Sequence, residues 1–373
     1  MRVGDEAPDR GRDARITMQV IVGLSGGVDS SVAALLLKDE GHEVTGVTMR
    51  LWREGRYAGG GRDACFGAGE ADDVKAAEAF CRRFGLPYRT FDCGEAFEQA
   101  ILANFRGEYL AGRTPNPCVR CNAQLKFGLL PDLARAAGLP FDRFATGHYA
   151  RTDDAGGRCR LLRARDTARD QSYFLYRLSQ EQLRRQLFPL GGLTKPEVRA
   201  LARRFGIAAA EKPDSQDFYS GDHAELIGAP DRPGNIVDET GRVMGRHAGF
   251  WKFTIGQRKG LGVAHPRPLY VLRVDACRNE VVVGPAERVR SRALVAGDCH
   301  WVSIAPPSAP LEVQIKIRST GEPVPGATLH PRGDGRIEAR FGGEGLAGVA
   351  PGQSAVFYQN DVLLGGGIIE EAG

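Results

Sequence analysis

The sequence predicts an α/β protein that begins with a doubly wound parallel sheet and continues into a small β-rich central module and a C-terminal β-barrel. Three observations lead to this prediction. Strand-like and helical segments alternate over residues 18–150, which is typical of a parallel sheet covered by helices. After Lys212 and Pro213, glycine and proline become frequent and short strand-like runs replace helices. The 373 residues are enough for two or three domains.

The long elements lie in the first half of the chain. The apolar run at 19–22 predicts a strand, and the helix expected at 30–38 ends near Gly41, a residue type common after helix ends. We expect further strands at 44–49, at 88–91 and near Phe144, and further helices at 72–84, 95–110 and after Thr194. In the last third, strands are expected at 269–274, 280–283, 311–317 and 355–358.

These elements suggest four segments. Residues 1–17 are polar and charged, and we interpret them as a disordered extension or a misassigned start, because Met18 directly precedes the first strand. The α/β domain is expected at 18–215, the central β-rich domain at 216–285 and the barrel at 286–373.

The composition excludes some classes of protein. No apolar run reaches the ~18–20 residues of a membrane span, and the first residues lack a signal-peptide core, so we expect a cytoplasmic protein with no membrane partner. In that compartment the eight cysteines are expected to be thiols, catalytic groups or metal ligands. The net charge of +4 permits RNA binding without requiring it.

Residues 23–30, Gly-Leu-Ser-Gly-Gly-Val-Asp-Ser, join the first strand to its helix. The glycines allow a tight turn, and the helix start offers unpaired N–H groups and partial positive charge. This arrangement predicts an anion site, most plausibly for phosphate. The run differs from the Gly-x-x-x-x-Gly-Lys-Ser/Thr loop and from the dinucleotide Gly-x-Gly-x-x-Gly fingerprint.

A second constellation is the Cys-x-x-Cys pair of Cys118 and Cys121. Pro115 and Pro117 forbid helix before Cys118, so the pair should lie at a helix start. A helix N-terminus and nearby arginines, Arg113 and Arg120, would lower a thiol pKa and make one cysteine a nucleophile. A redox pair or half of a zinc site are alternatives, although no second Cys-x-x-Cys exists.

The run at 23–30 resembles the loop of the N-type ATP pyrophosphatases, whose fold is that of the adenine nucleotide α-hydrolases. Together with further strings in the same order, it is similar to the bacterial tRNA-specific 2-thiouridylases over about residues 18–370. These strings are Thr-Pro-Asn-Pro at 114–117 with Cys-Asn at 121–122, Thr-Gly-His-Tyr-Ala at 146–150, Asp-Gln-Ser-Tyr-Phe-Leu at 170–175, Gly-Gln-Arg-Lys-Gly-Leu-Gly at 256–262 and Pro-Gly-Gln-Ser-Ala-Val-Phe-Tyr at 351–358.

The resemblance implies a tRNA-uridine 2-sulfurtransferase that uses ATP and Mg²⁺. ATP would adenylate the C2 oxygen of the wobble uridine in tRNAs for Lys, Glu and Gln, and sulfur would then replace AMP. The sulfur donor would be a cysteine desulfurase, a relay protein or sulfide. Such a base must leave its stack, which favours a single-stranded loop as substrate.

The resemblance also assigns roles to residues. Cys121 would be the nucleophile, with Cys118 beside it and Asp29 near the magnesium. ATP would contact Gly23, Leu24, Ser25, Gly26, Gly27, Val28, Asp29, Ser30, Met49 and Gly147. The tRNA would contact Asn116, Pro117, Cys118, His148, Arg169, Asp170, Gln171, Arg318, Ser319 and Gln353.

The chain departs from the family pattern at one position. Tyr219 stands where many members have a second cysteine that carries the incoming persulfide, and a phenol cannot carry one. Two hypotheses follow. In one, Cys118, Cys121 and either Cys65 or Cys93 ligate a four-iron four-sulfur cluster. In the other, Cys65, Cys93 or Cys118 delivers the persulfide and Cys121 remains the nucleophile.

Two other functions remain open from the sequence. The same loop serves other adenylating enzymes, such as amidotransferases and argininosuccinate-type ligases, which act on small molecules. A catalytically inactive relative that only binds tRNA would keep the fold without the second cysteine.

Overall fold

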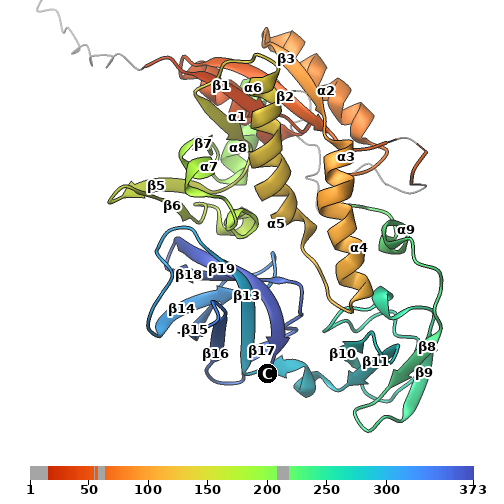
Figure 1. Cartoon of the computed structure of the whole chain (residues 1–373). Coiled ribbons are helices and arrows are strands. Elements are labelled where there is room, and N and C mark those ends of the chain that lie inside the picture. The colour runs from red at the N-terminus through yellow and green to blue at the C-terminus, as the bar shows by residue number, and fades with distance from the viewer. Residues whose placement is uncertain (1–15, 54, 58–63, 208–217) are drawn as a thin grey trace, which may run out of the picture.

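The computed structural model describes residues 16–53, 55–57, 64–207 and 218–373 (Figure 1). The predicted extension at 1–17 falls almost entirely outside these residues. The predicted domain boundary at 215–216 and the segment 212–217 lie outside them as well. The limits 18–215, 216–285 and 286–373 therefore stay predictions.

The first domain is built on a five-stranded sheet in the order β3-β2-β1-β4-β7, in which all neighbours are parallel. Its strands are β1 (Gln19–Gly23), β2 (Glu43–Arg50), β3 (Tyr88–Asp92), β4 (Arg143–Thr146) and β7 (Gln186–Leu187). The central strand β1 is apolar and buried along Val20–Val22, as expected for a parallel strand covered on both faces. The predicted doubly wound sheet is confirmed.

Helices cover this sheet and extend beyond it. They are α1 (Val28–Asp39), α2 (Glu70–Phe84), α3 (Gly94–Phe97), α4 (Ala103–Leu110), α5 (Pro117–Cys121), α6 (Leu130–Ala136), α7 (Gln180–Arg184) and α8 (Lys195–Arg204). Wide π-type turns at 98–102 and 122–129 join α3 to α4 and α5 to α6 into two long helices. The sequence predicted the helix at 95–110 but not the π-type turns, which are frequent at functional sites.

The central module contains a short helix and a four-stranded sheet in the order β10-β11-β8-β9. The elements are α9 (His223–Ile227), β8 (Gly234–Val237), β9 (Val243–His247), β10 (Tyr270–Asp275) and β11 (Glu280–Gly284). The predicted strands at 269–274 and 280–283 correspond to β10 and β11.

The C-terminal domain is a closed antiparallel barrel, because β13 pairs with both β16 and β19. Its strands are β13 (Ala293–Trp301), β14 (Leu311–Lys316), β15 (Val324–Pro331), β16 (Ile337–Phe341), β18 (Ser354–Gln359) and β19 (Val362–Ala372). The short strands β12 (Arg290–Ser291) and β17 (Leu346–Ala347) pair beside it. Closure removes the exposed edges that an open sheet would present.

A hairpin that the sequence did not predict ties the first domain to the barrel. It consists of β5 (Arg151–Ala155) and β6 (Arg158–Leu162), and β6 pairs with β19 through Leu161 and Leu162. Side chains from both domains then share one hydrophobic cluster, which includes Leu161, Tyr173, Tyr358 and Leu363. The two domains are thus joined by strand pairing as well as by packing.

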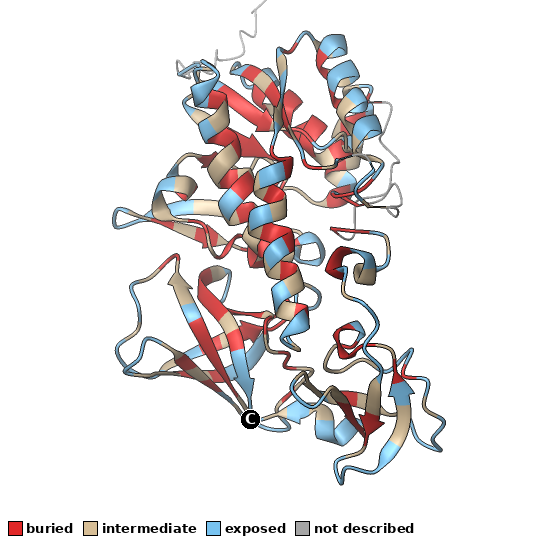
Figure 2. Ribbon diagram, turned by 45° about the vertical axis from the view of Figure 1, so that its right-hand side comes forward, coloured by how far each residue is buried: buried red, intermediate tan, exposed pale blue. Residues whose placement is uncertain are grey.

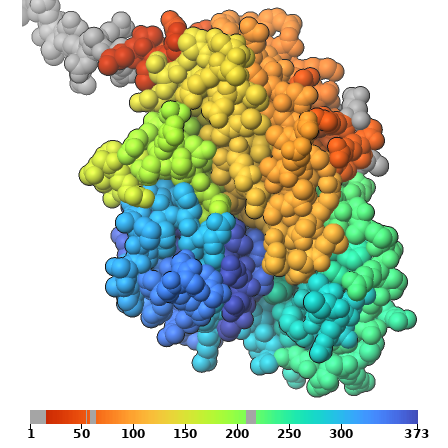
Figure 3. All heavy atoms as spheres, viewed as in Figure 1, coloured from red at the N-terminus to blue at the C-terminus, as the bar shows by residue number. Residues whose placement is uncertain are grey.

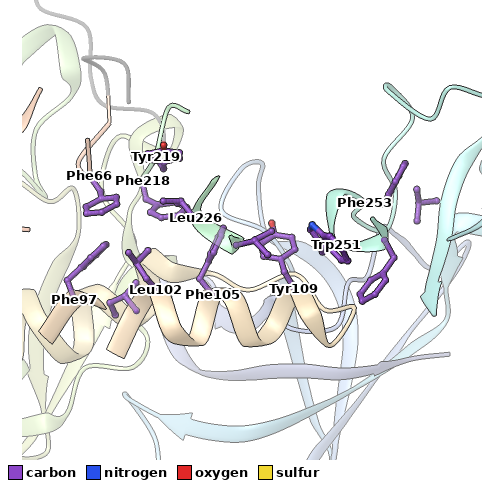
Figure 4. Close-up of a cluster of buried hydrophobic side chains, with 14 of the residues drawn as sticks. Phe66, Phe97, Leu102, Phe105, Tyr109, Phe218, Tyr219, Leu226, Trp251 and Phe253 are labelled. Atoms are coloured by element: carbon purple, nitrogen blue, oxygen red, sulfur yellow. The ribbon is translucent and has the colours of Figure 1, made fainter. Parts of the chain in front are cut away.

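A second cluster joins the first domain to the central module along α4. Phe105 and Tyr109 of α4 pack against Phe218, Leu226 and the aromatic residues around Trp251 (Figure 4). Figure 2 shows red, buried segments on the long helices, alternating with pale blue, exposed ones, and further red segments in the strands. In the space-filling view the orange α3–α4 helix lies between the blue barrel and the green-to-cyan central module (Figure 3).

Within the described ranges every helix is too short or too polar for a transmembrane span. This observation agrees with the apolar-run count made on the sequence.

Replacing Leu161 with alanine tests the importance of the joint between β6 and the barrel. Leu161 is fully buried, so Leu161→Ala is expected to lower the free energy of unfolding by about 2–5 kcal/mol in urea titrations. Val243→Ala is the control, because Val243 is 54% exposed and its loss should change stability by less than about 0.5 kcal/mol. An equal, small effect of both changes would contradict the proposed joint.

Candidate active site

The glycine-rich loop lies where the order of the parallel sheet reverses. The chain passes from β1 to β2 and β3 on one side, whereas β4 pairs with β1 on the other side. Ligands of open α/β sheets bind at the carboxyl ends of the strands at such a point. Gly23 and Thr146 are register partners there, so residues 24–27 and Gly147 leave the sheet side by side.

At two positions of this region the backbone lies so close to a neighbouring segment that only glycine fits. Gly26 has a positive φ of 70°, and a Cβ atom on it would lie 2.6 Å from the carbonyl oxygen of Asp73. A Cβ atom on Gly147 would lie 2.7 Å from the amide nitrogen of Ser30 in the first turn of α1. Larger residues would push the loop and the helix start apart.

Hydrogen bonds within the loop fix its shape. The backbone amide of Ser25 donates to Ser30 Oγ over 3.2 Å, and the two serine hydroxyls lie 3.3 Å apart. Gly27 precedes α1, where no side chain caps the helix, so the first amides of α1 are open to an anion. Leu24 and Val28 are buried, so these two residues can offer a ligand only their backbone.

Asp29 is held by two residues that the sequence did not single out. Lys195 Nζ lies 2.8 and 2.9 Å from the two carboxylate oxygens, and the Tyr149 hydroxyl donates to Oδ1 over 3.0 Å. The Lys195 side chain is only 7% exposed. Lys195 is the first residue of α8, where a positive charge is unfavourable for the helix dipole. This unusual placement was the one signal in the sequence that Lys195 has a charged partner.

Met49 lies near the end of β2, two residues beyond Val47, the register partner of Gly23. Its half-buried side chain contacts the cluster around Phe105 and the cluster around Leu161. It therefore lies at the same edge of the sheet as the loop.

Cys118 and Cys121 lie at a helix start, as predicted. Pro117 is the first residue of α5, and the Asn116 side chain caps the helix by accepting a hydrogen bond from the Val119 amide over 3.3 Å. Residues three apart lie on one helix face, so both thiols point the same way. Both cysteines pack against the cluster that contains Phe66 and Phe105.

The expectation of a lowered thiol pKa is wrong for Cys121. Burial raises the pKa of this thiol to about 12, and the charge of Lys126 only partly opposes the effect. Arg113, expected to help, instead pairs with Glu108 through two hydrogen bonds of 2.7 Å. Desolvation therefore outweighs the helix terminus and the arginines.

The helix of Cys121 reaches the glycine-rich loop through aromatic packing. Phe127, in the turn that continues α5, lies 5.4 Å from the ring of His148 between ring centroids. His148 directly follows Gly147, and its Nδ1 lies 2.8 Å from Thr146 Oγ1. Burial, and secondarily Lys126, lowers the pKa of His148 well below its usual value, so the ring is neutral at pH 7.

The other cysteines differ in exposure. Cys81 is a buried core residue of α2, and burial raises its pKa to about 12. Cys93 is buried at the end of β3, where burial raises its pKa to about 11, whereas Cys65 is exposed. Charges on Cys65 and Cys93 would raise the pKa of Cys121 further, so both thiols lie within electrostatic reach of it.

The cysteines do not fit an iron–sulfur cluster. All four candidate ligands, Cys65, Cys93, Cys118 and Cys121, are among the described residues, and no three Cys, His, Asp or Glu side chains of that part of the chain converge on a metal position. The cluster hypothesis is therefore not supported.

The barrel docks on the loop that carries the cysteines. The Thr114 amide donates to the Pro351 carbonyl over 2.8 Å, and Gln353 Nε2 donates to the carbonyls of Thr114 and Pro115 over 3.1 and 3.0 Å. Gly352 is required, since a Cβ atom there would lie 2.9 Å from the Thr114 amide nitrogen. Gln353, expected to contact tRNA, thus positions this loop with both of its N–H donors.

The remaining positions expected to contact tRNA fall into two groups. Asp170 is buried and accepts hydrogen bonds from Ala164 and Ser172, and Gln171 accepts one from the Tyr149 amide. Arg169 and Arg318 are exposed, and Ser319 is half-buried beside Arg318. The first group lies where it would shape the site, and the two arginines lie where they could meet a phosphate.

Comparison with known proteins agrees with this architecture. Three family descriptions match in succession: tRNA methyl transferase HUP domain over residues 18–219, tRNA methyl transferase PRC-barrel domain over 227–285 and Aminomethyltransferase beta-barrel domain over 291–369. Similar curated relatives carry a more specific name than these descriptions.

Two of these relatives are tRNA-specific 2-thiouridylases. One, from Endomicrobium trichonymphae, is 45% identical over 94% of this chain and 99% of its own length. Another, from Geotalea uraniireducens, is 48% identical over 95% of each chain. Identity at this level over nearly the whole of both chains shows that the protein belongs to the tRNA-specific 2-thiouridylase family.

Proposed function

We propose that this protein uses ATP to replace the C2 oxygen of the wobble uridine of tRNA with sulfur. One observation carries the proposal: the helix of Cys121 packs through Phe127 on His148, and the adjoining Gly147 touches the first turn of α1. This packing would bring the thiol and the phosphate-binding loop toward one edge of the sheet. The family membership supports the same activity.

The loop at residues 24–27 would hold the pyrophosphate of ATP. The open amides at the start of α1 and the hydroxyls of Ser25 and Ser30 supply hydrogen-bond donors to its oxygens. Gly23, Met49 and Gly147 border the same place and would contact the nucleotide.

The residues present also fit Mg²⁺, which prefers one or two carboxylates together with substrate phosphates. Asp29 would supply the carboxylate, and the ion would neutralise charge on the departing pyrophosphate. Lys195 and Tyr149 fix the direction of the Asp29 carboxylate before any ligand enters.

In the first chemical step, the C2 oxygen of uridine attacks the α-phosphorus of ATP, pyrophosphate leaves, and the uridine N3 proton is lost. In the second step, sulfur bonds to C2 and AMP leaves with the former C2 oxygen. Asn116, Pro117 and Cys118 would border the base, because they form the start of the helix that presents Cys121.

The raised pKa of Cys121 has a consequence for selectivity. A half-buried thiol that stays protonated reacts slowly with stray electrophiles in solvent. The Cys121 thiol would act as a nucleophile only toward a sulfur that has already been delivered into the site. Charge on Lys126 favours its thiolate there.

Recognition of the tRNA backbone falls to exposed arginines. Arg169 and Arg318 are suited to phosphate contacts because the guanidinium group offers a fork of donors. We propose tRNAs for Lys, Glu and Gln as substrates, the cytoplasm as the location and a persulfide-forming enzyme, a relay protein or sulfide as the sulfur source.

The decisive experiment supplies sulfide and measures AMP and pyrophosphate from ATP with and without an unmodified tRNA-Glu transcript. Thiolation of wobble uridine predicts that AMP forms only when the tRNA is present. Another adenylating enzyme of this fold would depend on a small molecule instead, and a protein that only binds tRNA would form no AMP. Either of those results would overturn the proposed function.

Removing the charge of Lys195 should weaken the ATP site. Lys195→Met leaves Asp29 with Tyr149 as its only described partner and is expected to lower kcat/KM for ATP in tRNA-dependent AMP formation by about 10- to 100-fold. Lys252→Met is the matched control, since Lys252 pairs with Asp231 at the surface, far along the chain in the central module. Unchanged kinetics of Lys195→Met in a folded protein would contradict the role given to this ion pair.

Alkylation should report the raised pKa of Cys121. With a pKa of about 12, the thiolate fraction grows about tenfold per pH unit, so iodoacetamide should label Cys121 about 100 times faster at pH 10 than at pH 8. Peptide mass spectrometry measures the labelling, and the exposed Cys277 shows that the reagent is active at both pH values. A rate that levels off below pH 9 would mean that the pKa is not raised.

A further inference from the structure

Three thiols of the catalytic half, those of Cys93, Cys118 and Cys121, border one hydrophobic cluster. Cys93 belongs to the cluster around Phe66 and Phe105, and Cys118 and Cys121 pack against it. Cys65 precedes Phe66, whose ring lies beside Phe97 in Figure 4. These segments, far apart in the sequence, therefore meet around a single set of buried side chains.

The thiols are not equally able to meet a sulfur donor from outside. Cys93 is 1% exposed, and Cys118 and Cys121 are half-buried at the start of α5. Cys65 is exposed. A persulfide carried by another molecule can therefore reach Cys65 without any rearrangement of the cluster, whereas it cannot reach Cys93.

The position of Cys65 is fixed against the segment that contains Tyr219. The Phe66 amide donates to the Phe218 carbonyl over 2.9 Å, and the same carbonyl accepts from Cys65 Sγ over 3.8 Å. Tyr219 itself is 1% exposed, and its hydroxyl donates to Glu225 over 2.5 Å. Its phenol is thus a core group (Figure 4), and the Cys65 thiol contacts the backbone of the preceding residue, Phe218.

We propose that Cys65 is the thiol that accepts sulfur from an external persulfide and presents it to the adenylated uridine, and that Cys121 then releases it. This proposal rests on the proposed function. A shared hydrophobic cluster supports it, because Phe66, the neighbour of Cys65, belongs to the cluster against which Cys121 packs.

Sulfur would pass from the donor to the base in three steps. The Cys65 thiolate attacks the terminal sulfur of a donor persulfide, the donor S–S bond breaks, and the donor leaves as a thiol. The terminal sulfur of the Cys65 persulfide then bonds to C2, and AMP leaves with the persulfide proton. Cys121 finally attacks Cys65 Sγ, and the sulfur stays on C2 while the Cys121 proton ends on N3 of the base.

The last step leaves a disulfide between Cys65 and Cys121. The transferred sulfur has gained two electrons and the two thiols have lost them. A dithiol reductant must therefore restore both thiols before the next turnover.

The experiment uses the full chain, ATP, unmodified tRNA-Glu transcript and glutathione persulfide as the sulfur source. Cys65→Ser is expected to lower 2-thiouridine formation by about 100-fold or more while changing tRNA-dependent pyrophosphate release in the first turnover by less than about twofold. Cys277→Ser removes another exposed thiol and is the matched control, expected to thiolate at the rate of the unaltered protein. After one turnover without reductant, non-reducing peptide mapping should find Cys65 joined to Cys121.

Several results would overturn the proposal. Normal thiolation by Cys65→Ser, a disulfide between Cys118 and Cys121 instead, or tightly bound iron that thiolation requires would each do so. Failure of the unaltered protein to release pyrophosphate with tRNA would remove the proposed function itself, and the role of Cys65 with it. Loss of thiolation by Cys65→Ser with first-turnover pyrophosphate release intact distinguishes a failure of sulfur delivery from a failure of adenylation.

Discussion

The docking of the barrel turn at residues 351–353 on the loop before α5 is the contact on which the site depends. Gln353 and Pro351 bond the backbone of Thr114 and Pro115, and Gly352 allows the two backbones to touch. The loop contains Pro115, which has no backbone N–H to donate, and the barrel fixes the backbone on both sides of its peptide bond. The barrel, at the far end of the chain, therefore decides where the cysteine helix begins.

From this contact the geometry continues toward the nucleotide. The helix of Cys121 runs from the barrel to the sheet, where Phe127 packs on His148 beside Gly147 (Figure 1). The thiol thus lies near the start of this helix, and the phosphate-binding loop lies near the residues that pack on its continuation. A base activated at the sheet edge would lie next to a thiol that the barrel has placed.

Much of this could be predicted from the sequence, because the signals are local. Strand β1, the glycine-rich turn and the helix start at Pro117 follow from apolar runs, glycines and prolines within a few residues of each other. Long-range contacts could not be predicted. Lys195 meets Asp29 across 166 positions of sequence, and the β5–β6 hairpin pairs with a strand of the barrel. Whether the pKa of Cys121 is raised or lowered depends on burial, and the spacing of a motif does not show how deeply its residues are buried.

The placement of the thiols bears on the two ways of delivering sulfur. An iron–sulfur cluster needs three ligands around one position, and no three Cys, His, Asp or Glu side chains of the described residues converge on one. A relay needs only two thiols used in succession, one exposed and one protected. The exposed Cys65 and the half-buried Cys121 meet that requirement, and the protected thiol then reacts only with sulfur that the exposed one has already brought to the base.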